Sequence, residues 1–249
     1  MNAYSLRHSL PAVVRASRPC ALPLVRHLRW LARGDSTSTD RAVSSGKPQT
    51  DGSRTSSVSR GSEAVSVAAV DPNDQGSALE TLLTEYHTWL AQEACEWAAD
   101  RDAAGAGTDA TEPLPNDGEY DPPAAAAEDG ATIANPEADA WAFLARNDGD
   151  AAGVVFLYGV SKDMAEIKRL YVRPEHRGEG VGRALCQAAI DAASEGRYRQ
   201  VGLTTPPWSK GAHALYEELA FEYTDPYPET ALPEELHDDA LFMRRALGS

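Results

Sequence analysis

The feature that most constrains this chain is a glycine-rich loop, Arg177-Gly178-Glu179-Gly180-Val181-Gly182, placed between a strand pattern and a helix pattern. The apolar residues of 165–172 predict a strand before the loop, and those from Val181 to about Gly196 predict a helix after it. Glycine lets the backbone turn sharply and approach a ligand closely. The start of a helix offers unpaired N–H groups and a partial positive charge to an anion. The loop therefore predicts a phosphate-binding site.

The spacing of the glycines excludes two familiar phosphate-binding motifs. Gly178-x-Gly180-x-Gly182 lacks the GxGxxG interval of a dinucleotide-binding fold, and no Gly-Lys-Ser/Thr follows it, as a nucleotide P-loop requires. Charge supports an anionic ligand, because eight of the 13 basic residues after residue 60 lie between Lys162 and Arg199. A locally basic segment in an acidic protein indicates a polyphosphate ligand, and CoA, with its pyrophosphate and 3′-phosphate, is one.

Composition divides the 249-residue chain into two regions. Residues 1–60 carry nine Arg and one Lys against three Asp, whereas the remainder carries 13 basic and 35 acidic residues. Residues 34–63 are dominated by Ser, Thr, Gly and charged residues, a composition that buries too little apolar surface to fold. We therefore predict a basic, Ser- and Arg-rich disordered extension over 1–62 and a folded domain over 63–249.

Three interpretations of the basic extension stay open. It fits an organelle transit peptide in being rich in Arg and Ser and poor in acidic residues. Its charge also fits a nucleic-acid-binding tail, although the ten basic residues are spread over sixty positions with few aromatic residues among them. The third interpretation is a disordered segment that the mature protein lacks. No stretch of it reaches the roughly 18 apolar residues of a membrane helix, so we expect no membrane partner.

The folded region is acidic in a way that resembles proteins of salt-loving microbes. It has only three Lys beside ten Arg, and its excess carboxylates would keep the surface hydrated while high salt screens their repulsion. The acidity then says little about partners. Cys20, Cys95 and Cys186 are widely spaced and form no CxxC, which argues against a metal site or a disulfide framework and favours a reducing cytoplasm.

The folded region shows strand and helix patterns around one irregular segment. A capping-box pattern at Ser77 and Glu80 begins a helix that runs to about residue 98. Residues 99–139 are rich in Ala, Gly, Asp and Pro and predict a long, acidic, irregular insert, with Pro122-Pro123 as breakers. The apolar positions of 165–172 change parity, which predicts a β-bulge near Lys168 or Arg169. Other expected elements are strands over 64–70, 140–146, 152–160, 200–205, 221–224 and 240–245, a hairpin turn at 147–150 and a helix over 212–219.

Three segments carry a family resemblance. Residues 166–185, EIKRLYVRPEHRGEGVGRAL, resemble the signature segment of the GCN5-related N-acetyltransferase (GNAT) superfamily. Residues 214–221, ALYEELAF, are similar to that family's late helix and the strand after it, and 118–123, GEYDPP, resemble a segment of one bacterial and archaeal branch. The likeness covers roughly 64–246, is strongest over 164–221, and does not include the basic extension.

The resemblance implies an α/β (α+β) fold, with a mixed, mostly antiparallel sheet of about six to seven strands flanked by helices and a bulged strand before the CoA loop. In this family the glycine loop binds the CoA pyrophosphate through backbone amides, and the preceding strand pairs with the pantetheine arm. The implied co-substrate is acetyl-CoA, with no metal. The cofactor-binding residues that follow are Leu170, Tyr171, Val172, Arg177, Gly178, Glu179, Gly180, Val181, Gly182 and Arg183.

The resemblance also implies two proton-transfer residues. Tyr216 lies where the family commonly places the acid that protonates the departing thiolate, and a phenol stays protonated at neutral pH. Glu166, on the strand beside the acceptor pocket, is the first candidate for the base that deprotonates the amine, with His213, His176 or a water chain as alternatives. Cys186 falls in mid-helix, so we expect direct transfer in a ternary complex.

Two departures from the family pattern affect these expectations. Ala220 replaces the usual glycine before the aromatic residue of the late helix, so the turn there is expected to differ. Ser209-Lys210-Gly211 replaces an asparagine common at the start of that helix.

The expected activity is acetyl transfer to a primary amine of a small molecule or peptide. A non-catalytic acyl-CoA-binding or regulatory module of the same fold is the alternative. Acceptor specificity is expected from the helix over 79–98, the 99–139 insert and the loop over 227–236. We expect no nucleic-acid partner and leave a homodimer open.

Overall fold

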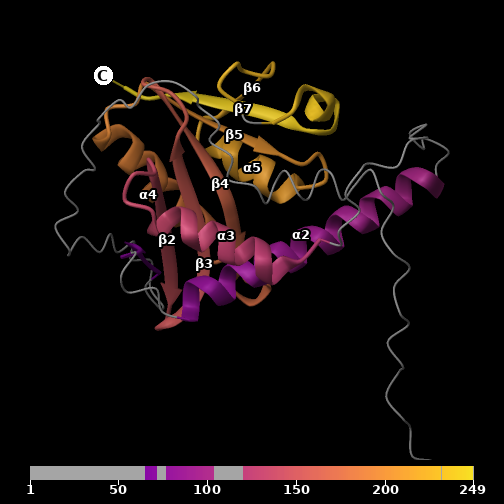
Figure 1. The fold of residues 1–249 in the computed structure, drawn as a ribbon, viewed down its shortest axis with the longest axis horizontal. Helices are drawn as coiled ribbons and strands as arrows, with labels where there is room; N and C mark the ends of the chain where they lie inside the picture. The colour runs from indigo at the N-terminus through magenta and orange to yellow at the C-terminus, as the bar shows by residue number, and fades with distance from the viewer. Residues whose placement is uncertain (1–64, 72–76, 104–119, 231, 249) are drawn as a thin grey trace, which may run out of the picture.

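A seven-stranded mixed sheet forms the centre of the computed structural model, which describes residues 65–71, 77–103, 120–230 and 232–248 (Figure 1). Its strand order is β1-β2-β3-β4-β5-β7-β6, and β4 with β5 is the parallel pair among antiparallel ones. This confirms the predicted sheet. The strands are β1 Ser66–Ala69, β2 Ala140–Asn147, β3 Asp150–Gly159, β4 Met164–Val172, β5 Gln200–Thr205, β6 Glu222–Thr224 and β7 Leu241–Ala246. The helices are α2 Ser77–Ala103, α3 Pro122–Ala134, α4 Val181–Glu195 and α5 Lys210–Glu218, with 3₁₀ turns η1 Pro174–His176 and η2 Glu234–Asp239.

Helices cover both faces of the sheet, and the alternation of β3 shows the two cores. Val155 and Leu157 face a core built with α4 and α5, whereas Val154 and Phe156 face a second core built with α2 and α3. All four side chains are fully buried. Strand β3 therefore has apolar residues on both faces and is central to the sheet, since neither face meets water.

The hairpin between β2 and β3 forms at the predicted turn. Asp148 and Gly149 both have positive φ, 52° and 90°, as a two-residue turn needs when it joins twisted antiparallel strands. The remaining strands and helices lie within a few residues of their predicted bounds. The basic extension lies outside the described residues.

The bulge predicted in β4 is present at Arg169. Phe156 of β3 pairs with Lys168 and Val154 pairs with Tyr171, so β4 has one extra residue between these pairs. Arg169 takes the left-handed conformation, with φ of 57°. Pairing of β4 with β5 ends just before the bulge, at Ile167 and Leu203, although β5 continues to Thr205. The two central strands therefore separate from Lys168 onward.

The prediction of irregular structure throughout 99–139 is wrong for Pro122–Ala134, which form helix α3. Asp121 caps this helix, since its carboxylate accepts a hydrogen bond from the Ala124 amide at 3.4 Å. Pro122 and Pro123 occupy the first turn, where proline has no intrahelical hydrogen bond to lose and its fixed φ suits the helix. The prolines that suggested a break instead begin a helix. Helix α2 also extends beyond residue 98, to Ala103.

The turn after α5 keeps its left-handed conformation without glycine. Ala220 has φ of 62°, and its amide is bonded to the Glu217 carbonyl at 2.9 Å. An alanine at positive φ is strained by the contact between its Cβ and the backbone.

Replacing Ala220 by glycine should therefore raise the free energy of unfolding, by about 0.5–1 kcal/mol, because relief of strain exceeds the entropy that glycine adds to the unfolded chain. Denaturant unfolding measures the change. Ala214→Gly, at an exposed helical position of α5, is the matched control and should destabilise by about 1 kcal/mol. Equal destabilisation by both substitutions would contradict the strain at Ala220.

Candidate active site

The glycine loop leads from β4 into α4 through left-handed backbone. Gly178 and Gly180 have φ of 83° and 88°, a backbone conformation that residues other than glycine rarely adopt. Gly180 is the N-cap of α4, and no side chain caps this end of the helix. The amides of the first helical turn therefore remain available to an anion, and the helix dipole favours one there.

Gly182 serves a different purpose from the two glycines before it. A Cβ at this position would lie 3.2 Å from Leu215 Cδ2 and 3.6 Å from Val172 Cγ2. Glycine thus allows α4 to approach α5 and the end of β4 closely. The loop and both helices meet here at one cavity.

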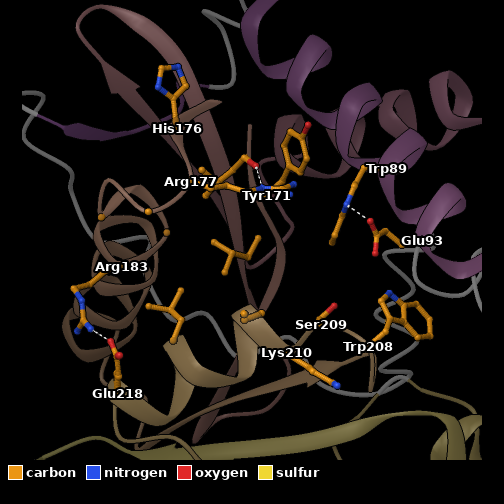
Figure 2. Close-up of a pocket in the computed structure, with 18 residues that line it drawn as sticks. Trp89, Glu93, Tyr171, His176, Arg177, Arg183, Trp208, Ser209, Lys210 and Glu218 are labelled. Carbon is orange, nitrogen blue, oxygen red and sulfur yellow. Dashed lines mark hydrogen bonds and ion pairs between the residues drawn. The ribbon is translucent and has the colours of Figure 1, made fainter. Parts of the chain in front are cut away.

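The cavity has a volume of about 560 Å³ and runs from the glycine loop to helix α2 (Figure 2). Leu170, Tyr171 and Val172 of β4 line its middle, opposite the start of α5. Eight of the ten predicted cofactor-binding residues line it, namely Leu170, Tyr171, Val172, Arg177, Gly178, Gly180, Gly182 and Arg183.

The other two predicted cofactor-binding residues do not line the cavity. Val181 is buried in the core beneath α4. The Glu179 carboxylate accepts a hydrogen bond from Asn147 Nδ2 at 2.7 Å and lies 3.4 Å from His176 Nδ1. Glu179 therefore ties the loop to the end of β2.

Basic side chains surround the loop end of the cavity. Arg177 donates from Nε to the Val172 carbonyl at 3.0 Å, and its guanidinium lies 5.7 Å from the centre of the Trp89 ring. Arg183 pairs with Glu218, whereas Lys210 lines the wall at the start of α5, on the side of Trp208 (Figure 2). Arg173, in contrast, is bound by the Glu85 carboxylate through two contacts of 2.8 Å and fastens β4 to α2.

Aromatic residues from α2 and the loop before α5 form the opposite end. Trp89 and Trp208 lie across the cavity from Arg183 in Figure 2. Trp89 packs against Tyr171 at 6.0 Å between ring centres and donates from Nε1 to Glu93 at 3.2 Å. The apolar periodicity of α2 predicts core-facing residues, and the loop before α5 has no periodicity. The sequence patterns therefore did not predict these tryptophans at the site.

A smaller cavity of about 70 Å³ opens where β4 separates from β5. Trp89, Leu170, Ser209 and Ala212 line both cavities, so the two adjoin. Tyr216, the predicted acid, lines the smaller one together with Lys168 and Arg169. Burial, assisted by the Cys186 thiol and Tyr86, raises the pKa of Tyr216 well above 10.

Glu166, the predicted base, is fully buried and lines neither cavity. Its Oε1 accepts a hydrogen bond from the Tyr227 hydroxyl at 2.7 Å and from Thr204 at 3.4 Å. Its Oε2 lies 3.1 Å from Lys168 Nζ. Lys168 therefore connects the Glu166 carboxylate with the cavity where the strands separate.

The two histidines named as alternative bases lie elsewhere. His213 is buried, and its Nε2 bonds to the Pro206 carbonyl at 3.0 Å. His176 stands in the turn beside the glycine loop, close to Asn147. Neither lines the cavity where the strands separate.

A second buried polar cluster lies behind the bulge. Asp129 of α3 accepts hydrogen bonds from Arg169 Nε at 2.7 Å, from Arg169 Nη2 at 3.0 Å and from His87 Nε2 at 2.8 Å. The other ring nitrogen of His87 lies 2.6 Å from the Tyr120 hydroxyl. Burial would raise the pKa of Asp129, but Arg169 and His87 outweigh it and lower that pKa. Burial lowers the pKa of His87 despite its contact with Asp129.

Cys186 is free and buried in α4, and burial raises the pKa of its thiol to about 12. Cys95 is disulfide-bonded. Within the described ranges, no three potential ligands cluster as a metal site would need, and no helix has the length and apolar character to cross a membrane.

The sheet is mixed, its two central strands separate, and an uncapped helix follows a basic glycine loop. Together these features define an acyltransferase class of fold. Residues 109–221 match the model of the "Acetyltransferase (GNAT) family". An uncharacterised N-acetyltransferase of Escherichia coli, YjgM, is 30% identical over 112 residues, which are 40% of this chain and 67% of that protein. The chain therefore belongs to the GNAT family and is an acetyltransferase.

Other relatives match over a smaller part of their length. The N-acetylaspartate synthetase of Xenopus tropicalis is 29% identical over 36% of this chain and 34% of that enzyme. Acetyltransferase structures from Streptococcus agalactiae and Staphylococcus aureus each superpose on 74% of the chain with a TM-score of 0.50. They cover 98% and 100% of those chains at 16% and 14% identity, which shows a shared fold.

The buried His87 should make stability depend on pH. A histidine whose folded pKa is lowered binds a proton more readily when unfolded, so its contribution is present above pH 6.5 and is lost as pH falls toward the folded pKa. Over that window the free energy of unfolding of the wild type should fall by up to about 1.4 kcal/mol per pH unit more than that of His87→Gln. Denaturant unfolding from pH 7.5 to 4.5 measures both. Parallel curves would contradict a neutral His87.

Proposed function

We propose that this protein transfers the acetyl group of acetyl-CoA directly to a primary amine of a small molecule or peptide. One observation carries the proposal: an uncapped helix start with basic neighbours opens into a cavity that adjoins the gap between β4 and β5. A donor with phosphates at one end and a thioester at the other fits this arrangement.

In this proposal the CoA phosphates lie against the amides at Gly180 and Gly182, with Arg177 and Arg183 nearby. The pantetheine arm follows the middle of the cavity along Leu170–Val172. The polarity supports this placement, because the loop end supplies cations and N–H donors whereas the middle is mostly apolar.

The thioester then lies in the gap between the strands. Its carbonyl accepts a hydrogen bond from the backbone at Arg169–Leu170, where β4 no longer pairs with β5. Such a donor stabilises the oxyanion that forms when the amine attacks. When the intermediate collapses, the C–S bond breaks and Tyr216 donates its proton to the thiolate. The high pKa of this buried phenol keeps it protonated until that step.

The ammonium form of the acceptor must lose a proton before it attacks. We assign that proton to the Glu166–Lys168 pair, in which Lys168 passes its proton to Glu166 and takes one from the acceptor. Their contact of 3.1 Å and the position of Lys168 on the cavity wall support this relay. An unchanged kcat in Glu166→Gln would assign the proton to a chain of waters instead.

The buried state of Cys186 supports direct transfer. A covalent acetyl-cysteine would require a thiolate, and a pKa of about 12 makes that form scarce at neutral pH. The Trp89–Glu93 end of the cavity supports a cationic acceptor, since an ammonium binds favourably to both an aromatic face and a carboxylate.

The proposal is tested by acetyl-CoA consumption with small amines, amino acids and peptides, at low and high salt. Gly180→Asp should weaken CoA binding at least about 100-fold, because its carboxylate would face the phosphates. Gly149→Asp, at another positive-φ glycine but in the β2–β3 hairpin, should bind CoA normally. Calorimetric titration with CoA measures both. Normal CoA binding without consumption of acetyl-CoA by any amine would favour the non-catalytic alternative.

Tyr216→Phe should lower kcat about 100-fold and leave the dissociation constant of CoA within twofold of the wild type. The substitution keeps the packing against Phe221, which lies 5.9 Å away between ring centres, and removes only the proton donor. Steady-state kinetics and calorimetry together give the two values. An unchanged kcat would remove Tyr216 from the reaction.

A further inference from the structure

Asp129, Arg169 and His87 form a buried cluster. Of these three residues only Arg169 lines a cavity, the smaller one. Asp129 and Arg169 are 1% and 5% exposed, and His87 is fully buried. Substrate and solvent therefore do not reach the Asp129 carboxylate. A buried ion pair is weak evidence for added stability, because the cost of taking two charges out of water offsets their attraction.

Arg169 is the residue at which the backbone of β4 departs from a regular strand. Its φ of 57° is unfavourable for a residue with a Cβ, and the surrounding structure must hold it there. Two contacts, Nε to Oδ2 at 2.7 Å and Nη2 to Oδ1 at 3.0 Å, bind the guanidinium to the carboxylate at two points. This pairing fixes both the position and the orientation of the Arg169 side chain.

Asp129 is itself held from two elements. Helix α3 carries it, and His87 of α2 donates to the same oxygen that Arg169 Nε contacts. The Tyr120 hydroxyl lies 2.6 Å from the other nitrogen of His87. With His87 neutral, the cluster has one positive and one negative charge. The Tyr120 hydroxyl then donates to His87, and His87 Nε2 donates to Asp129. The bulge is therefore fastened to the two helices that cover this face of the sheet.

We propose that Asp129 is a positioning residue for acetyl transfer, which through Arg169 holds the bulge backbone in the direction that polarises the thioester carbonyl. This inference rests on the proposed function. It gives the α3 segment a role in the reaction without contact with either substrate.

The test is Asp129→Asn, which keeps the size of the side chain and removes its charge. We expect kcat to fall on the order of 100-fold, as when an oxyanion donor is lost, while the dissociation constant of CoA stays within twofold. Any preference of the wild type for acetyl-CoA over CoA in calorimetry should disappear, because only acetyl-CoA has the carbonyl. A merely structural role would not change that ratio.

Asp139→Asn is the matched control. Asp139 accepts a hydrogen bond from Tyr198 and lines neither cavity, so the control should retain kcat and the affinity ratio. Should Asp129→Asn fail to fold, Arg169→Lys replaces it, since lysine keeps the buried charge but loses the two-point contact. Folded protein that binds CoA and retains kcat in the variant tested overturns the inference. A wild type that neither binds CoA nor transfers acetyl overturns the proposed function instead.

Discussion

The separation of β4 from β5 is the constraint on which the rest of this structure depends. Parallel strands at the centre of a sheet normally pair along their whole length, because an unpaired backbone group buried there is costly. Here the pairing stops at Ile167 and Leu203, and Arg169 turns β4 away by adopting a left-handed conformation. The backbone polar groups beyond that point adjoin a cavity, where a ligand with a carbonyl and amides can satisfy them.

One continuous segment then serves both ends of the proposed donor. The bulge lies at Arg169, and the first glycine of the loop follows only nine residues later at Gly178. In the proposed complex a single strand and turn, not two independently placed elements, contacts both the thioester and the phosphates. Arg169 fastens this segment to α3 and Arg173 fastens it to α2, so both helices on this face of the sheet hold it.

Local patterns in the sequence were sufficient for the backbone of this segment. The change of parity in 165–172 predicted the bulge, and glycines before an apolar pattern predicted a turn into a helix, because each signal lies within a few residues of the structure it causes. The contact of Asp129 with Arg169 joins residues forty positions apart, and no local pattern specifies such a pair. Helix α3 was missed for a different reason: Pro122-Pro123 breaks a helix in its interior but begins one after a capping residue such as Asp121.

The net charge of the chain conceals how charge is arranged at the site. The carboxylates of Asp129 and Glu166 are buried against Arg169 and Lys168, so these four groups balance one another inside the protein. They do not belong to the surface acidity that resembles salt adaptation. Around the larger cavity, Arg177 and Arg183 flank the glycine loop, whereas Lys210 lies with Trp208 on the side that carries Glu93. In the proposed complex the donor phosphates lie at the glycine loop and a cationic acceptor lies near Glu93, so the charge of each substrate favours a different part of the cavity.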